Sequence, residues 1–358
     1  MTKPRIGIIG AGIYGTYVLK AFAYAHRMGQ IELVALADIK KDLLQEKVKE
    51  FKIKGYLDYK EMIKKEALDA IAVVTPDFFH REIALEVASH GIHLLVEKPL
   101  DVSVEGAKEM VRAAKENNIL LFVDFHKRFD PAHIILKKQI QQGKLGKVQY
   151  GYIWVEDKIE VPSVWFKNWA HKSSPAWFLG IHIYDLLYWL LKSKPKKIYA
   201  TGIKDKLINM GIDTYDSLQA KIEFANGASI TVDTSWTLPN SFPSITNQGI
   251  RIIGSNGIWE IDGQDRGIFY SIEEDRIANI PNYYSMIEKE HPFFGTIRQG
   301  YVVESMMYFL QLVTELKKGT TVQDIAGLYP SGEEAIISTL ICESVHESAK
   351  IGKPIELN

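Results

Sequence analysis

Cysteine is almost absent from this chain: Cys342 is the only one among 358 residues. A single thiol cannot form an intramolecular disulfide, so a disulfide-stapled scaffold and a multi-cysteine zinc site are excluded. Free cysteine is usually a small buried side chain, and we expect this of Cys342 in preference to a nucleophile. We also expect no bound metal.

An excess of charge is lacking too, because 43 lysine and arginine residues balance 44 aspartate and glutamate residues, for a formal net charge of −1. This balance gives the whole protein no attraction for nucleic acid or for an anionic membrane. No segment reaches the ~18 apolar residues of a spanning helix, and the first residues do not resemble a signal peptide. We therefore expect a cytoplasmic protein with neither kind of partner.

The composition is that of an ordinary globular protein, with 46% hydrophobic and 24% charged residues. The length of 358 residues suggests two domains. In residues 1–124, short apolar runs alternate with helical patterns. The runs are Ile6–Ile9, Leu33–Ala37, Ala70–Val74, His93–Val96 and Leu120–Val123, with a weaker one at Gly55–Leu57. This alternation predicts an α/β domain with a parallel sheet covered on both faces.

After about residue 146 the pattern changes to alternating, aromatic-rich strands. These are Val148–Val155, Lys196–Ile203, Ser217–Phe224, Ser229–Trp236, Gly249–Ile253 and Ile258–Ile261. Helices are expected at Ile181–Leu191, Tyr301–Lys318 and Ser331–Ser348. Residues 125–358 therefore predict an α+β domain with a large, mostly antiparallel sheet, whose closing helix could pack back on the first domain.

The first apolar run leads into a glycine-rich loop, Gly10-Ala11-Gly12-Ile13-Tyr14-Gly15, which fits G-x-G-x-x-G. The loop follows a predicted strand and opens a predicted helix, the context in which this pattern binds the pyrophosphate of a dinucleotide. The three glycines would serve the tight turn, the approach of the pyrophosphate and the packing of helix on strand. We therefore identify residues 1–124 as a Rossmann dinucleotide-binding domain.

Asp38 follows the second run and is placed to bind the ribose hydroxyls of the adenosine. Its charge would repel a 2′-phosphate, which favours NAD over NADP. Lys40 and Lys41 come directly after it and could offset this repulsion, so NADP stays possible. The alternative for Asp38 is a helix cap.

Three further segments carry a family resemblance. They are Thr75-Pro76-Asp77-Phe78-Phe79-His80, Glu97-Lys98-Pro99 and Gly180-Ile181-His182-Ile183-Tyr184-Asp185. With the glycine loop, they make the whole chain resemble the glucose-fructose oxidoreductase/inositol dehydrogenase (Gfo/Idh/MocA) family of NAD(P)-dependent oxidoreductases.

The resemblance implies that Thr75, Pro76 and His80 flank the dinucleotide. It also implies that Glu97 and Lys98 lie beside the nicotinamide ribose, with Lys98 reaching the substrate hydroxyl, and that Arg128 lies near the cofactor or substrate. The alternatives are a helix-leading residue for His80 and solvated charges for Lys98 and Arg128.

Oxidation of a secondary alcohol needs a base, and a histidine with a pKa near the working pH suits this task. His182 is the candidate. Asp185, three residues later, shares its helix face and could orient the ring or bind the substrate. Lys98 would hold the hydroxyl and stabilise negative charge on its oxygen.

Substrate contacts are predicted at Trp165, Trp169 and His171, whose rings and polar groups suit a sugar, although they could instead be core or oligomer contacts. Many family members carry an aspartate four residues before the histidine. This chain has Phe178 there, so we expect an apolar part of the substrate to face it.

Three functions follow from these residues. The first is an NAD(P)-dependent dehydrogenase of a sugar, a cyclitol or a sugar derivative. The second is an enzyme that retains NAD and uses transient oxidation to epimerise a sugar or cleave a glycoside. The third is a non-catalytic regulator that senses cofactor or sugar. A homodimer or homotetramer is expected from the resemblance.

Overall fold

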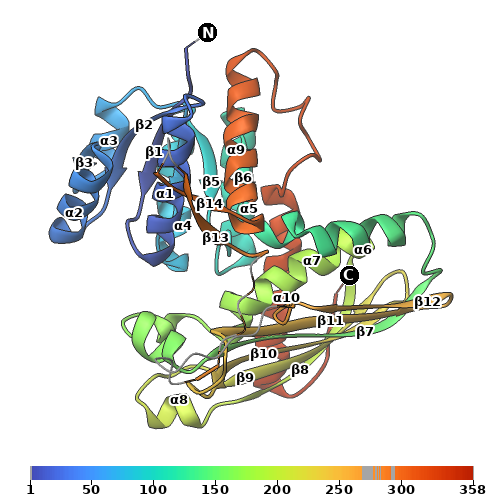
Figure 1. Cartoon of the computed structure of the whole chain (residues 1–358). Coiled ribbons are helices and arrows are strands. Elements are labelled where there is room, and N and C mark those ends of the chain that lie inside the picture. Colours follow the sequence, from blue (N-terminus) through green and yellow to red (C-terminus); the bar gives the residue numbers. More distant parts are fainter. Residues whose placement is uncertain are drawn as a thin grey trace. The chain divides into compact units, whose positions relative to one another are not determined.

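The computed structural model describes residues 2–267, 277–278, 280, 282, 284–291 and 295–357. Its contacts divide the chain into two compact units, shown in Figure 1. Unit 1 comprises Met1–Phe129 and Tyr284–Ile336, and unit 2 comprises Asp130–Tyr283 and Ile337–Asn358. Residues 284–336 thus belong to the N-terminal unit. The domains expected from the sequence, residues 1–124 and 125–358, placed this segment in the second domain.

Unit 1 contains a six-stranded, all-parallel sheet in the order β3-β2-β1-β4-β5-β6. The strands are β1 Arg5–Ile9, β2 Glu32–Ala37, β3 Lys54–Tyr56, β4 Ala70–Val73, β5 His93–Val96 and β6 Leu121–Val123. The order reverses between β1 and β4, which is where dinucleotides bind in folds of this kind. The predicted parallel sheet is confirmed.

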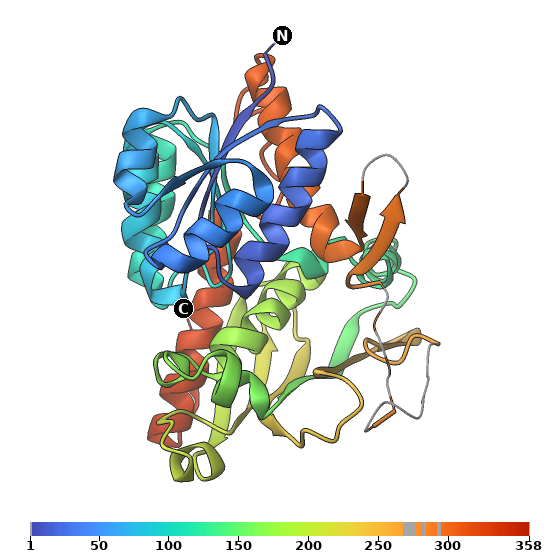
Figure 2. The same cartoon turned by 60° about the vertical axis from the view of Figure 1, so that its left-hand side comes forward.

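Helices cover both faces of this sheet (Figure 2). They are α1 Ile13–Arg27, α2 Lys41–Phe51, α3 Tyr59–Lys65, α4 His80–Ser89, α5 Val104–Glu116 and α9 Tyr301–Lys317. The last of these explains why residues 284–336 belong to unit 1: Phe309 of α9 and Tyr329 both contact the ring of Phe122 in β6. A two-stranded hairpin, β13 Ile287–His291 and β14 Gly295–Gln299, also contacts α1.

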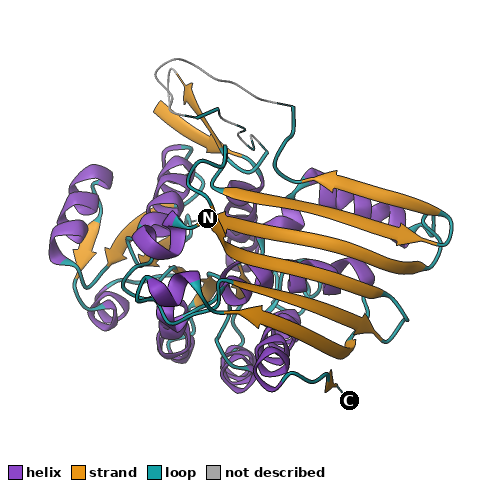
Figure 3. Ribbon diagram, turned by 90° about the horizontal axis from the view of Figure 1, so that it is seen from below, coloured by secondary structure: helices purple, strands orange, loops and turns teal. Residues whose placement is uncertain are grey.

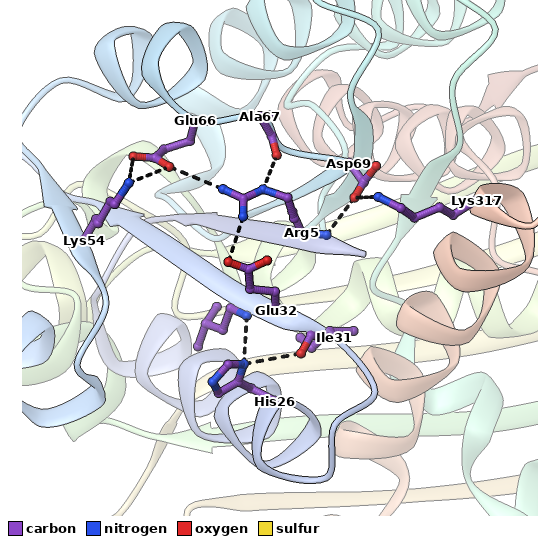
Figure 4. A network of polar contacts seen from close by, with 10 residues as sticks. Arg5, His26, Ile31, Glu32, Lys54, Glu66, Ala67, Asp69 and Lys317 are labelled. Atoms are coloured by element: carbon purple, nitrogen blue, oxygen red, sulfur yellow. Dashed lines mark hydrogen bonds and ion pairs between the residues drawn. The ribbon is translucent and has the colours of Figure 1, made fainter. Parts of the chain in front are cut away.

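Charged side chains tie the start of the sheet together (Figure 4). Arg5 donates to Glu32 (2.7 Å) and to the Ala67 carbonyl (2.7 Å), and its backbone N–H donates to Asp69 (2.7 Å). Lys317 of α9 also donates to Asp69. The C-terminal part of unit 1 is therefore bonded directly to its N-terminal part.

Unit 2 is built on a seven-stranded sheet in the order β12-β11-β7-β10-β9-β8-β15. The strands are β7 Val148–Lys158, β8 Pro195–Ile203, β9 Ser217–Phe224, β10 Ser229–Leu238, β11 Thr246–Gly254, β12 Gly257–Asp262 and β15 Ile355–Glu356. Only β7 and β10 pair in parallel; the other described pairs are antiparallel, as predicted. A turn at Asn226-Gly227 joins β9 to β10, and Gly227 has the positive φ of +87° that such a hairpin needs.

The helices of unit 2 are α6 Pro131–Gln141, α7 Ile181–Leu191, α8 Lys206–Asn209 and most of α10, which spans Gly332–Ile351. Ser348 of α10 accepts the backbone N–H of Ala200 in β8 (2.8 Å), so α10 packs on the sheet. Figure 3 looks onto the other face, which no helix of the described chain covers. Among the described helices, none combines the length and the apolar composition that crossing a bilayer requires.

Candidate cofactor and active site

The glycine loop joins β1 to α1 and has room for a ligand. Gly10 has φ = +105°, and a Cβ there would lie 2.5 Å from the Val74 carbonyl oxygen, so only glycine fits. A Cβ at Gly15 would clash with the Gly10 carbonyl, whereas nothing lies within 4 Å of one at Gly12. The backbone of Gly12 therefore borders open space, as a pyrophosphate would require.

The first turn of α1 supplies hydrogen-bond donors to this space. Within the described chain, no side chain caps the helix at Gly12, and the first turn contains no acidic residue. The N–H groups of the first turn of a helix have no partner inside the helix, and they carry the positive end of its dipole. They fit the phosphates of a dinucleotide.

Asp38 lies at the end of β2 beside the loop. Its Oδ2 accepts the backbone N–H of Ala11 (2.8 Å), and its Oδ1 accepts that of Lys40 (2.7 Å). These bonds fix the carboxylate and leave further lone pairs for hydroxyl donors. Asp38 lies outside α2, so the alternative of a helix cap is weaker than the ribose contact, which stays a prediction.

His80 braces the two turns that follow β4 and β5. One ring nitrogen lies 2.8 Å from the Pro99 carbonyl and the other 2.9 Å from the Thr75 carbonyl. Carbonyl oxygens only accept, so a protonated ring nitrogen is the donor toward either turn. His80 is fully buried, and its predicted contact with the dinucleotide remains a prediction. The buried Thr75 hydroxyl has no partner in the described chain, which leaves it available to a ligand.

Lys98 follows β5 and is 5% exposed, with its ammonium 3.7 Å from Glu97 Oε1. Burial raises the pKa of Glu97 well above its ordinary value, and the positive charge of Lys98 opposes this only in part. Nearby, burial lowers the pKa of His126 well below its ordinary value, and Lys127 and Lys98 lower it further. Lys98 therefore stands in a buried setting where its charge acts strongly.

Asp124, directly after β6, is the centre of a buried hydrogen-bond cluster. The Tyr14 hydroxyl donates to its Oδ2 (2.6 Å), and the Ser305 hydroxyl from α9 donates to its Oδ1 (2.6 Å). Glu97 is close enough for a side-chain hydrogen bond to the same carboxyl group. Burial raises the pKa of Asp124, and these donors limit the rise. Asp124 comes directly after the predicted strand Leu120–Val123, but the sequence pattern indicated neither Ser305 nor the role of the Tyr14 hydroxyl.

Arg128 has a partner within unit 1. It is buried, and its guanidinium is hydrogen-bonded to the Glu334 carboxylate at the start of α10. This ion pair gives Arg128 a structural role, and its predicted contact with cofactor or substrate remains a prediction.

In unit 2, α7 carries His182 and Asp185, which are 7% and 1% exposed. The helix is preceded by a π-helical turn at Ala176–Gly180, a local geometry that is frequent at functional sites. Three residues apart on the helix, the two side chains lie on the same face, as the sequence predicts.

Phe178, in that π-helical turn, is part of an aromatic cluster. Its ring centroid lies 4.6 Å from that of Phe166, 6.4 Å from that of Trp169 and 6.0 Å from that of Trp236 in β10. The structure thus brings together two of the four predicted substrate residues, Phe178 and Trp169. It adds Phe166 and the buried Trp236, which the sequence pattern did not single out.

Trp165 and His171, the other two predicted substrate residues, are exposed.

His346 of α10 contacts two residues at the start of the π-helical turn Ala176–Gly180. The Ser174 hydroxyl lies 2.7 Å from His346 Nε2, while His346 Nδ1 lies 2.8 Å from the Cys342 carbonyl oxygen and donates to it. The His346 ring also stacks on Trp177 at 5.6 Å. Burial lowers the pKa of His346, which favours the neutral ring that accepts from Ser174. Cys342 itself is buried, as expected.

Comparisons with known proteins agree with these features. Residues 4–125 match the family model described as "Oxidoreductase family, NAD-binding Rossmann fold", and residues 133–260 match the "GFO/IDH/MocA C-terminal domain". Together the two matches cover more than half of the chain.

Among individual proteins, scyllo-inositol 2-dehydrogenase (NAD(+)) of Bacillus subtilis (strain 168) is 29% identical over 241 residues, covering 66% of this chain and 68% of that protein. Myo-inositol 2-dehydrogenase of Thermotoga maritima is 27% identical over 261 residues, or 71% and 73% of the two chains. A crystal structure of myo-inositol 2-dehydrogenase from Lactobacillus plantarum superimposes with a TM-score of 0.80 at 20% identity, covering all of both chains, and so has the same fold.

Proposed function

The chain belongs to the GFO/IDH/MocA family of oxidoreductases, whose Rossmann domain binds NAD, and from this premise we propose that it oxidises a secondary alcohol of a sugar, a cyclitol or a sugar derivative. The observation that carries this proposal is the buried Lys98 at the carboxyl end of β5, in the unit that holds the glycine loop. Bound NAD supplies the hydride acceptor. The side chains of this protein bind the alcohol and move its proton.

Lys98 binds the reacting hydroxyl in this proposal. Its ammonium donates a hydrogen bond to the alcohol oxygen and stabilises the negative charge that grows there as the proton leaves. The neighbouring Glu97 supports this role, because the raised pKa of Glu97 favours a neutral acid, which offsets the charge of Lys98 less than a carboxylate would.

His182 takes the proton from the alcohol. A neutral imidazole accepts one proton through one nitrogen while the other nitrogen is oriented by a neighbour, and Asp185 on the same helix face is the proposed orienting group. Both side chains are almost fully buried, which limits exchange of the proton with bulk water.

The cofactor preference proposed from Asp38 is NAD. The fixed carboxylate suits the two ribose hydroxyls of adenosine and repels a 2′-phosphate at the same place. The substrate proposal rests on the aromatic cluster of Phe166, Trp169, Phe178 and Trp236. Phe178, one turn before His182, belongs to this cluster and stands where many family members carry an aspartate. An aspartate there would bind hydroxyl groups, whereas a phenylalanine ring offers an apolar surface, so the substrate brings an apolar face or substituent to it.

We also propose that the protein forms a homodimer or homotetramer through the uncovered sheet face of unit 2. Tyr199, Tyr152 and Arg251 lie in one row across this face, because each pairs in register with its neighbouring strand. Tyr150, Tyr152 and Tyr199 are 56%, 42% and 43% exposed, and tyrosine is a residue that protein interfaces favour. Light scattering that gave a mass of 40.6 kDa at micromolar concentration would contradict this assembly.

The test of function is a spectrophotometric panel of monosaccharides, uronates, anhydro sugars and cyclitols with NAD and with NADP. Formation of reduced NAD with at least one member, in proportion to enzyme, supports the proposal. Turnover of a sugar without added cofactor would instead show an enzyme that retains NAD. No redox change with any member, although NADH binds, would favour a sensor.

A further inference from the structure

The side chain of Tyr14 has no part in the glycine-loop pattern. That pattern uses the backbone of residue 14, whose N–H faces the phosphates, and it leaves the side chain open. In this chain the side chain is a tyrosine, and its hydroxyl bonds to Asp124, 110 positions along the sequence. A contact of this length across the cofactor unit calls for a structural or a binding role.

The contact lies on the β4–β6 side of the strand reversal, away from Asp38. Tyr14 begins beside β1, and Asp124 follows β6, so in the order β1-β4-β5-β6 the side chain reaches over the ends of the intervening strands. Asp38, on the β2 side of the loop, marks the adenosine half. A dinucleotide that crosses the point of strand reversal therefore places its other half on the Tyr14 side.

Tyr14 is only partly buried, although its hydroxyl is held inside the unit and its side chain packs against the hydrophobic core. Tyr14 is half-buried as a residue, whereas the Asp124 carboxyl group that holds its hydroxyl is fully buried. The Tyr17 ring lies 6.2 Å from the Tyr14 ring, centroid to centroid, at an interplanar angle of 85°, so the two rings do not stack on each other.

Two hydroxyl donors fix the carboxyl group that accepts the Tyr14 hydroxyl. Tyr14 and Ser305 donate to the two oxygens of Asp124. Glu97 Oε2 is buried and receives no hydrogen bond in the described chain, but a proton on Glu97 would turn its contact with Asp124 into a third donated bond. The carboxyl pair then holds one proton and one negative charge, an arrangement that two closely spaced buried acids favour.

We propose that the ring of Tyr14 is a platform against which the nicotinamide ring of NAD stacks, held at a fixed angle by the bond from its hydroxyl to Asp124. The inference rests on the NAD site of the proposed function and goes beyond it, because it assigns a side chain to the reactive half of the cofactor. An aromatic face is a suitable partner for the flat pyridine ring, and anchoring at the far end limits the entropy lost on stacking.

The experiment compares two ligands, NADH and ADP-ribose, which differ by the nicotinamide riboside half. Their dissociation constants are measured by calorimetry, without substrate, for the wild-type protein and for Tyr14→Leu, Tyr14→Phe and Tyr17→Leu. Tyr17 is the matched control, because it is on the same helix and its ring contacts Arg298 (4.5 Å).

We expect Tyr14→Leu to weaken NADH binding roughly 5- to 100-fold, the usual effect of removing an aromatic ring that stacks on a base. ADP-ribose binding should stay within about 2-fold of wild type, because this ligand has no nicotinamide. Tyr14→Phe keeps the volume of the ring and loses its anchor, so it should show a smaller loss that is again confined to NADH. Tyr17→Leu should change neither ligand.

Two results would overturn the platform. Equal weakening of NADH and ADP-ribose by Tyr14→Leu and Tyr14→Phe would show that Tyr14 only shapes the phosphate loop. Unchanged NADH binding in both variants would show that the ring does not touch the cofactor. Failure of the wild-type protein to bind ADP-ribose would instead count against the NAD site itself, and failure to oxidise alcohols would count only against the proposed dehydrogenase.

Discussion

Replacement of Lys98 should separate chemistry from cofactor binding. Lys98→Met keeps the length of the side chain and removes its charge at a site that is 5% exposed. At a separation of ~3 Å and an effective dielectric constant of ~20, an ammonium group attracts a full negative charge by about 5 kcal/mol. Measured losses of single donors to an oxyanion are smaller, ~2.7–4 kcal/mol, or ~100- to 1000-fold in kcat.

The state of Glu97 makes this range applicable here. An ionised Glu97, 3.7 Å from Lys98, would neutralise much of the charge that acts on the substrate. Because burial raises the pKa of Glu97, its neutral form is favoured, and Lys98 keeps its effect. For the same reason Lys98→Met should leave no isolated charge on Glu97, and Tyr14 and Ser305 still donate hydrogen bonds to Asp124, so the variant should fold.

The assay is steady-state reduction of NAD at saturating cofactor, with NADH affinity measured in parallel by fluorescence. The expected result for Lys98→Met is a fall in kcat of ~100-fold or more with NADH affinity within about 3-fold of wild type. Lys108→Met, an exposed lysine on α5, is the control and should match wild type. A kcat for Lys98→Met within about 3-fold of wild type would refute the assignment, and a parallel loss of NADH binding would place Lys98 in cofactor binding alone.

Three further predictions follow from other parts of the chain. Asp38→Asn should raise kcat/KM with NADP relative to NAD by roughly 10-fold, since ~1.4 kcal/mol of charge repulsion is removed; an unchanged ratio would clear Asp38 of cofactor selection. Phe178→Leu should raise KM for the best substrate ~2- to 10-fold with little change in kcat, as expected for a ring contact worth ~0.5–1.5 kcal/mol; a loss in kcat alone would place Phe178 in the chemistry. The pKa of Glu66 is lowered overall, because hydrogen bonds from Lys54 and Tyr56 outweigh the effect of burial, which acts to raise it. The Glu66 carboxylate therefore stabilises the fold at pH values above its unfolded pKa of about 4.3, and this stabilisation is lost as the pH falls through its lower folded pKa. Glu66→Gln should therefore lower the free energy of unfolding by ~1–3 kcal/mol at pH 7 and by less near pH 3, and denaturant unfolding at both pH values that showed equal differences would contradict this.

Much of the parallel sheet could be predicted because its signals are local. The apolar run Ile6–Ile9 lies within β1, and the helix expected at Ile181–Leu191 has the same bounds as α7. Helix α6 was not predicted, although its start carries a local signal: Asp130 caps the helix and Pro131 occupies its first turn. The short α3 has seven residues and therefore almost no periodicity to detect.

The candidate site was predictable only where a motif or a strand end marked it. Asp38, Glu97 and Lys98 stand at strand ends, where topology brings polar groups together. The contact of Tyr14 with Asp124 and that of Ser174 with His346 join residues more than 100 positions apart, and no pattern in the sequence encodes such pairs. Sequence spacing likewise gives no sign that β7 and β10 run in parallel, because 81 positions separate their starts.

The path of the chain through unit 1 has a consequence for how the protein is made. The first 129 residues belong to this unit. The chain then passes into unit 2 and returns to unit 1 only at Tyr284. A ribosome therefore releases the glycine loop early but cannot supply Phe309, Tyr329 or Ser305 until more than 300 residues have been synthesised. Until then Phe122 lacks the two rings that contact it, and Asp124 has the bond from Tyr14 but not that from Ser305, so the nucleotide-binding unit cannot complete its packing before this late segment is made.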